Sequence, residues 1–172
     1  RIETQPVLLR QAITIAVPKG PHGLVVYDSS DPAAKPLARE IFTREIAEPG
    51  TTAELASRAG HALVARGYHS QVTPHEGAIS LFHLAASREA VKAADGRVTI
   101  GDRTMTLEAL AREAEQSPEH FSPNVLLRPV VQDAIFPTIC YVAGPNELAY
   151  LGQLRDVYAH FGIAMPLMYQ RS

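Results

Sequence analysis

The hydrophobic and polar positions near the start of the chain predict a strand followed by a helix. The apolar run at 24–28 is short and continuous, which is typical of a buried strand. Asp31 before Pro32 is a strong helix start, because aspartate caps free amides and proline suits the first helical position. A helix is therefore expected over 32–47, kinked or delayed by Pro36.

A second helix is predicted from residue 51. Thr51 and Glu54 have the spacing of a capping box, in which each side chain satisfies a free backbone amide. The apolar face expected for this helix consists of Leu55, Ala59, Ala62 and Leu63. Gly67 ends the helical pattern, and 68–72 is predicted to be the next strand. This order of strand, two helices and strand favours a sheet covered by helices.

The middle of the chain has the pattern of short antiparallel strands. Strand character is found at 79–85, 88–93, 98–100 and 104–105. Asp95 and Gly96 form a strong hairpin signal, because both residues tolerate the positive φ angles of a tight turn. Gly101 and Asp102 supply a second turn. A small antiparallel meander is therefore expected at 78–105.

In the last third of the chain, the apolar residues again recur at the spacing of a helix. Thr106 is expected to cap a helix, and a proline-punctuated loop follows at 117–123. Beyond the loop, the pattern predicts a helix, a strand, a helix and a strand at 129–136, 138–142, 146–160 and 165–169. The chain is thus predicted to be an α/β protein, with core segments at 1–77 and 106–172 on either side of the meander.

The length, charge and composition of the chain exclude several classes of protein. The chain has 172 residues, so it can bury about 70% of its unfolded surface without a metal or a disulfide. The net charge is −2 and the Lys and Arg residues are scattered, so no nucleic-acid partner is expected. The sequence has no secretory signal and no apolar stretch that could span a bilayer, so we expect a cytoplasmic protein without a membrane partner. Because the chain begins with Arg1, a piece of a longer polypeptide is expected.

Polar side chains gather where the strand predicted at 138–142 turns into the following helix. The residues expected to bind a ligand at this turn are Gly144, Pro145, Asn146, Glu147 and Tyr150. Amides at a helix start favour a carboxylate or phosphate, and Glu147 could hold a substrate ammonium. Two plainer interpretations stay open. Any α/β protein needs such a turn, and Glu147 could simply be a favourable charge at the helix start.

Three more polar residues precede this turn and are also expected to bind the ligand: Arg128, Gln132 and Asp133. Arg128 comes before a proline, so its backbone is expected to be extended, and its guanidinium can grip a carboxylate. An ion pair between Arg128 and Asp133 is the structural alternative. Gln132 and Asp133 lie opposite the apolar positions of their helix, so exposure to solvent is equally consistent with the pattern.

The sequence predicts no metal site and assigns no catalytic residue. The seven histidines show no metal-ligand spacing, and most are expected on the surface or in loops. Cys140 lies in an apolar run, so a buried small hydrophobic residue is expected there. The chain also lacks a phosphate-binding glycine loop and a Gly-x-Ser-x-Gly motif.

Three runs of sequence resemble a known family. They are Ser122–Asp133, Tyr141–Tyr150 and His160–Pro166, with supporting matches at Pro21–Pro32, Gly67–Val72 and Leu81-Phe82. The residues of these runs, and the order of the runs along the chain, are similar to those of the bacillithiol-biosynthesis cysteine-adding enzymes. Asn146 departs from the family pattern, which usually has glycine at that position and so allows a closer approach of the ligand.

The resemblance implies a Rossmann-like layered core, of which this chain is a part. It also implies an enzyme that joins L-cysteine to glucosaminyl malate to form bacillithiol. Family members are longer and carry a coiled coil for dimerisation, so the parent protein is expected to be a homodimer. No cofactor is expected in this chain itself, while ATP is a possible activator for the full-length enzyme.

Two functions follow from these observations. In the first, residues 128–150 form one wall of the active site of a ligase, and the isolated chain is inactive because other groups are missing. In the second, the chain is a non-catalytic Rossmann-like module that binds other parts of its own polypeptide. The first is the function that we expect.

Overall fold

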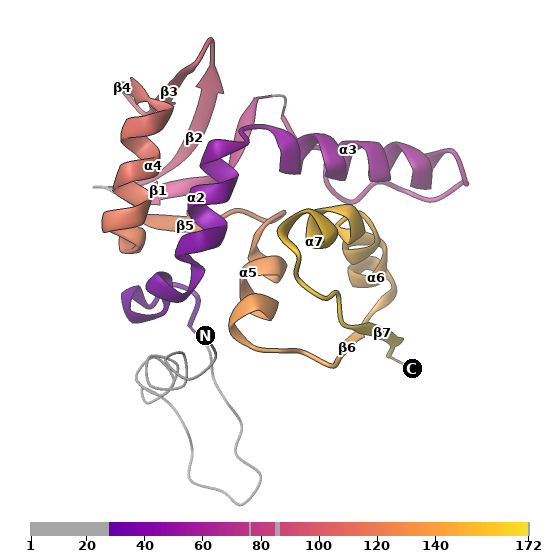
Figure 1. The fold of residues 1–172 in the computed structure, drawn as a ribbon. Helices are drawn as coiled ribbons and strands as arrows, with labels where there is room; N and C mark the ends of the chain where they lie inside the picture. The colour runs from indigo at the N-terminus through magenta and orange to yellow at the C-terminus, as the bar shows by residue number, and fades with distance from the viewer. Residues whose placement is uncertain (1–27, 76, 85–86, 172) are drawn as a thin grey trace, which may run out of the picture.

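The computed structural model describes residues 28–75, 77–84 and 87–171, which form two sheets flanked by helices (Figure 1). The larger sheet is antiparallel, with the strand order β4-β3-β2-β1-β5. Its strands are β1 (Ala78–Leu84), β2 (Arg88–Ala94), β3 (Arg97–Ile100), β4 (Arg103–Thr106) and β5 (Phe121–Pro123). The smaller sheet pairs β6 (Cys140–Ala143) in parallel with β7 (Leu167–Gln170).

The helices fall into two groups around these sheets. They are α2 (Arg39–Ala47), α3 (Thr51–Val64), α4 (Leu107–Gln116), α5 (Arg128–Ile135), α6 (Pro145–Gly152) and α7 (Arg155–Phe161), with the 3₁₀ helices η1 (Pro32–Ala38) and η2 (Pro118–His120). Helices α2 and α4 lie side by side against the larger sheet, while α6 packs on β7 (Figure 1). Helix α7 contacts both α3 and α5, and so connects the two groups.

One continuous hydrophobic core runs through both groups. Phe42 of α2 packs against Phe121 of β5, with 6.4 Å between the ring centroids. On the other side, Leu154 and Tyr158 of the α7 region are fully buried. Within the described residues, no helix has both the length and the apolar character needed to cross a membrane.

Several elements predicted from local pattern are present. Oδ1 of Asp31 accepts a hydrogen bond from the Ala33 amide at 2.9 Å and starts η1. Pro36 lies inside η1, so the α-helix begins only at Arg39, which is the delay expected from a proline without an amide hydrogen. The strands and hairpins of the meander also form, with positive φ at Asp95 and Gly96. The division of the chain into three segments stays a prediction.

Three predictions for the region after α2 differ from the structure. Thr51 does not cap α3, because the helix begins at Thr51 itself and Gly50 occupies the cap position with φ of +84°. The fully buried residues of α3 are Thr52, Ala53, Ala56 and Gly60, whereas of the expected face Leu55 is partly buried against the core. The segment 68–72 is not a strand, since the side chain of Gln153 binds its backbone in place of a neighbouring strand.

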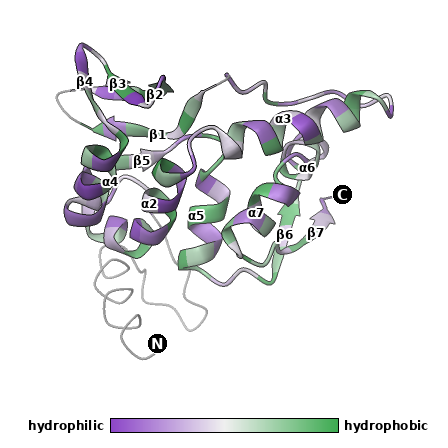
Figure 2. Ribbon diagram, turned by 45° about the horizontal axis from the view of Figure 1, so that its top comes forward, coloured by the Kyte–Doolittle hydropathy of each residue, from purple (hydrophilic) through white to green (hydrophobic). Residues whose placement is uncertain are grey.

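The C-terminal part differs from its prediction at three points. The helix expected over 146–160 is divided into α6 and α7 next to Gly152, a residue with low helix preference. The loop at 117–123 contains η2 and β5. Strand β6, coloured as hydrophobic in Figure 2, is exposed on one face, and Cys140 is exposed rather than buried. The strand predicted at 24–28 lies outside the described residues except for Asp28.

Candidate functional site

A small hollow lies between α5, β6 and α6 and contains half of the residues predicted to bind a ligand. Its volume is about 200 Å³. The polar residues that line it are Ser29, Arg128, Gln132, Asp133, Tyr141 and Tyr150. Arg128, Gln132, Asp133 and Tyr150 were all expected from the sequence, so the structure brings these four together.

The turn before α5 fixes the position of Arg128. Oδ1 of Asn124 accepts hydrogen bonds from the amides of Leu126 and Leu127 at 2.9 and 3.3 Å, which closes the turn and starts the helix. Arg128 is the first residue of α5, and its amide donates to the Asn124 carbonyl at 3.0 Å. The extended backbone expected for Arg128 is therefore wrong, because the following proline occupies the first helical turn, where it is tolerated.

Tyr150 connects α6 to the same turn. Its hydroxyl donates a hydrogen bond to the carbonyl of Val125. Burial raises the pKa of Tyr150 to about 12, although the nearby Arg128 guanidinium acts in the opposite direction. Tyr150 is therefore a neutral phenol at physiological pH, and it can present a polar edge to a ligand without adding charge.

Asp133 is buried beneath the hollow rather than exposed to solvent, with 7% of its surface accessible. Its carboxylate accepts hydrogen bonds from Thr138 Oγ1 at 2.6 Å and from the Tyr158 hydroxyl at 2.5 Å. Burial, followed by the Asp133 carboxylate, raises the pKa of Tyr158, so its hydroxyl stays protonated and continues to donate. No ion pair with Arg128 forms within the described ranges. These two hydrogen bonds fix the position of Asp133, and with it that of α5.

Arg128 also borders an adjoining hollow of about 360 Å³ that reaches the larger sheet. Arg88 lines this second hollow, where its guanidinium lies 4.0 Å from the centroid of the Phe82 ring. A terminal nitrogen of Arg88 donates to the Pro123 carbonyl at 3.5 Å. Among the residues that the structure describes, neither Arg88 nor Arg128 has a carboxylate within salt-bridge distance. Arg88 and Arg128 therefore line the second hollow together, and Arg128 lines both hollows. We refer to these two hollows, which share Arg128, as the cleft.

The other predicted residues lie at the start of α6 and do not line this cleft. Oε2 of Glu147 accepts a hydrogen bond from the Gly144 amide at 2.8 Å, so Glu147 caps its own helix. Pro145, Asn146 and Glu147 are exposed, while Gly144 is buried. A ligand-binding role for these four residues stays a prediction.

Two larger hollows contain none of the predicted residues. One, of about 370 Å³, lies at the start of α3 beside Glu54 and His75. The other, of about 650 Å³, lies over β1 and β2 and is lined mainly by apolar side chains. Neither brings unpaired cations together, so the smaller cleft around Arg128 is the better candidate site for an acidic ligand.

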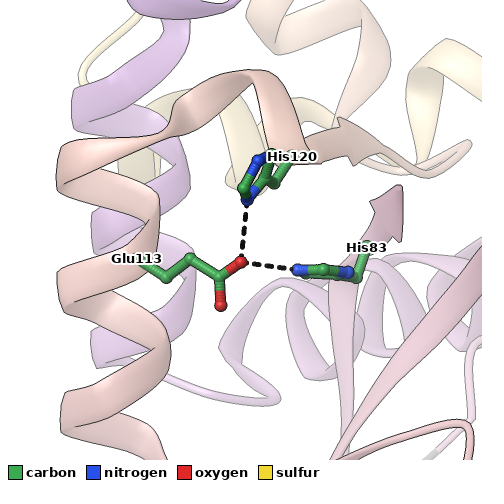
Figure 3. Close-up of side chains that lie close together, drawn as sticks. All are labelled: His83, Glu113 and His120. Atoms are coloured by element: carbon green, nitrogen blue, oxygen red, sulfur yellow. Dashed lines mark hydrogen bonds and ion pairs between the residues drawn. The ribbon is translucent and has the colours of Figure 1, made fainter. Parts of the chain in front are cut away.

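A cluster of His83, Glu113 and His120 was not found from the sequence (Figure 3). His83 is buried, with 3% of its surface accessible, so it departs from the surface or loop location expected for most histidines. A sequence signal was present, because His83 lies four and two residues after Ile79 and Leu81 and so points to the same, buried side of β1. Its partners, Glu113 and His120, lie on α4 and η2. Their separations from His83 along the chain do not indicate that the three residues meet.

The matching family model and the curated relatives agree on one family. The model of the N-terminal Rossmann-like domain of BshC, a protein of bacillithiol biosynthesis, matches residues 18–172. Together with the mixed helices and sheets, this match confirms the expected Rossmann-like α/β class. Within the part of the chain that the structure describes, the large antiparallel sheet is accompanied by two parallel strands, β6 and β7.

Curated relatives carry the name "Putative cysteine ligase BshC". The protein from Salinibacter ruber is 40% identical over 154 residues, which cover 87% of this chain and 28% of that relative. The one from Chlorobium phaeobacteroides is 38% identical over 153 residues, covering 86% of this chain and 27% of the relative. The one from Thermus thermophilus is 35% identical over 153 residues, which cover 89% of this chain and 32% of the relative. The chain thus spans less than a third of the length of these relatives.

Proposed function

Because this chain belongs to the family of the BshC N-terminal Rossmann-like domain of bacillithiol biosynthesis, we propose that it forms one wall of the active site of a cysteine ligase. The names of the relatives support this class of reaction. We further propose that the substrates are L-cysteine and glucosaminyl malate. The other walls come from the rest of the parent polypeptide, so the 172-residue chain alone is inactive.

The observation that carries this proposal is the pair of arginines along the cleft. Arg88 and Arg128 border the same cleft, and neither is neutralised by an acidic side chain within the described part of the chain. An arginine binds a carboxylate through two parallel hydrogen bonds, which gives both affinity and a fixed orientation. The malate part of glucosaminyl malate carries two carboxylates, so the charges match.

The size and lining of the cleft fit a small polar acid. The hollow at Tyr150 has about 200 Å³ and the one at Arg88 about 360 Å³, and Arg128 borders both. Ligand pockets usually measure about 300–1,000 Å³, so the hollow at Arg88 lies at the lower end of the common range by itself. Gln132 and the neutral Tyr150 line the smaller part and can provide uncharged hydrogen bonds.

The reaction requires an activated carboxyl group. The amine of the glucosamine unit attacks the carboxyl carbon of cysteine, forms an amide bond and displaces a leaving group. An unactivated carboxylate does not react in this way, so we propose ATP as the co-substrate that supplies the leaving group. No described residue is assigned to bind ATP, and we place that site in the remaining part of the parent protein.

The exposed face of β6 and β7 supports a second role, in assembly. Ile139, Val142, Leu167 and Tyr169 are between 59% and 84% exposed. Val142 pairs with Tyr169 across the two parallel strands. Parallel sheets are normally covered on both faces, and this one is covered on one face only. We propose that another part of the same polypeptide covers this surface, consistent with the docking module considered from the sequence.

Activity of the parent protein tests the proposal. The full-length protein with Arg128→Ala should add cysteine to glucosaminyl malate with kcat/KM reduced at least about tenfold, since a charged hydrogen bond to substrate is lost. Arg66→Ala, an exposed arginine outside the cleft, should leave the rate unchanged. Full activity of Arg128→Ala, or product formation by the 172 residues alone, would contradict the proposal.

A further inference from the structure

We propose that His83, Glu113 and His120 bind a divalent transition-metal ion. Nε2 of His83 and Nδ1 of His120 lie 2.8 and 2.9 Å from the same oxygen, Oε1 of Glu113 (Figure 3). The three potential ligand atoms all lie within 4.8 Å of one another. This site is separate from the cleft around Arg128 and goes beyond the proposed ligase function.

Three different elements hold the ligands. His83 comes from β1, Glu113 from α4 and His120 from η2, so the cluster joins the sheet to the helix that covers it. The His83 ring packs edge-on against Phe121, with 5.3 Å between the centroids, which restricts its rotation. A ligand set assembled from rigid elements loses little conformational entropy when an ion binds.

These ligand atoms fit divalent ions of the transition metals, which bind both nitrogen and oxygen. Two imidazoles and one carboxylate are common ligands of Zn²⁺, Co²⁺, Ni²⁺ and Fe²⁺, whereas Ca²⁺ and Mg²⁺ prefer oxygen ligands throughout. With metal–ligand bonds of about 2.0–2.2 Å, tetrahedral neighbours lie about 3.4 Å apart. Oε1 of Glu113 therefore has to move roughly half an ångström from each imidazole to admit the ion. Rotation of the Glu113 side chain allows this movement.

The cluster is open on one side. The side chains of Glu113 and His120 are 24% and 46% exposed, while that of His83 is buried. An ion can therefore enter from solvent, and water can complete its coordination. A terminal nitrogen of Arg103 lies 4.0 Å from the other oxygen of Glu113, which directs Oε1 toward the two histidines. The metal ion replaces the hydrogen bonds that join the three side chains in its absence.

Binding of Zn²⁺ to the 172-residue chain tests the proposal. Calorimetry with ZnCl₂ should give one equivalent at micromolar affinity, and Co²⁺ should give the visible absorption of an imidazole-bound ion. His120→Ala and Glu113→Gln should each weaken binding at least about tenfold, because the first removes a ligand and the second replaces a charged carboxylate ligand with a neutral amide. His61→Ala, which removes an exposed histidine of α3, is the matched control and should bind like the unmodified chain.

Circular dichroism without metal shows whether the variants keep their fold. Glu113→Gln retains a side chain of the same shape, and His120 is half exposed, so both should remain folded. The Co²⁺ spectrum of the unmodified chain does not depend on any variant. Absence of Zn²⁺ binding and of the Co²⁺ spectrum would overturn the proposal. Equal affinity in Glu113→Gln, His120→Ala and the unmodified chain would overturn it as well.

Discussion

The hydroxyl of Tyr158 donates a hydrogen bond of 2.5 Å to Oδ2 of Asp133, and this contact joins α7 to α5 beneath the proposed binding cleft. Both residues are buried, and Thr138 Oγ1 donates to the other oxygen of Asp133. A buried carboxylate is stable only when hydrogen bonds satisfy it. The pair therefore holds α5, and with it Arg128, in place.

Tyr158→Phe is expected to destabilise the chain by about 1.5–3 kcal/mol, because it leaves one oxygen of a buried carboxylate without its donor. Urea unfolding monitored by circular dichroism measures the change. Tyr169→Phe is the matched control, since Tyr169 is 65% exposed and its hydroxyl has no described role. A difference below about 0.5 kcal/mol between the two variants would contradict a structural role for the Tyr158–Asp133 contact.

Gln153→Met is expected to release the segment 70–72. Oε1 of Gln153 accepts from the amides of Gln71 and Val72 at 2.7 and 3.0 Å, and Nε2 donates to the Val72 carbonyl at 3.1 Å. Methionine keeps the volume but removes these bonds, so a loss of at least about 2 kcal/mol is expected. Hydrogen exchange at the two amides should accelerate more than exchange in α4. Unchanged protection at residues 71 and 72 would show that Gln153 does not hold the segment.

A pair of glycine substitutions tests the same contact from its other side. A Cβ at Gly60 would lie 2.8 Å from both Nε2 of Gln153 and Oγ of Ser70. At Gly152, no described atom beyond its chain neighbours and its own helix backbone lies within 4 Å of such a Cβ. Gly60→Ala should therefore destabilise the chain, while Gly152→Ala should be neutral or stabilising because alanine favours helix. Thermal unfolding compares the two variants. Similar midpoints would refute the close packing around Gln153.

Glu45 is expected to make stability depend on pH. Burial raises the pKa of this carboxyl, although Thr52 Oγ1 and the Ser80 amide donate hydrogen bonds to it at 2.5 and 2.6 Å. Because the folded chain binds this proton more tightly than the unfolded chain, the contribution to stability is full below the ordinary Glu pKa of about 4.3. It is lost as the pH rises through the raised pKa of the folded state.

Glu45→Gln removes this titration and should flatten that part of the pH profile. The measurement is the free energy of unfolding from urea curves at a series of pH values. Glu40→Gln, on the exposed face of the same helix, is the control and should follow the unmodified chain. Parallel pH profiles for Glu45→Gln and the unmodified chain would mean that Glu45 ionises as freely when folded as when unfolded.

The elements that could be predicted from sequence are those that local interactions determine. Asp31 caps its own helix two residues on, Thr106 caps α4, and Asp95 with Gly96 makes a turn between adjacent strands. Each of these signals acts within a few residues, so its pattern is visible along the chain. The same holds for the spacing of Ile79, Leu81 and His83 in β1, which places His83 on the inward face although its partners could not be foreseen.

The features that could not be predicted depend on partners that are distant in sequence. Gln153 binds a backbone segment 81–82 residues away and thereby replaces the strand expected at 68–72. Asp133 is buried because Tyr158, 25 residues later, donates to it. Arg128 and Tyr150 were expected in the site, but their meeting at the turn 124–127 depends on the hydrogen bond from Tyr150 to Val125, 25 residues earlier.

The most direct test of the proposed binding cleft is calorimetric titration of the chain with glucosaminyl malate, compared with the same titration of Arg128→Ala and Arg66→Ala. We predict millimolar or tighter binding to the unmodified chain and to Arg66→Ala, and a loss of at least about tenfold in Arg128→Ala. Binding of equal strength to all three proteins, or no binding to the unmodified chain, would contradict the account.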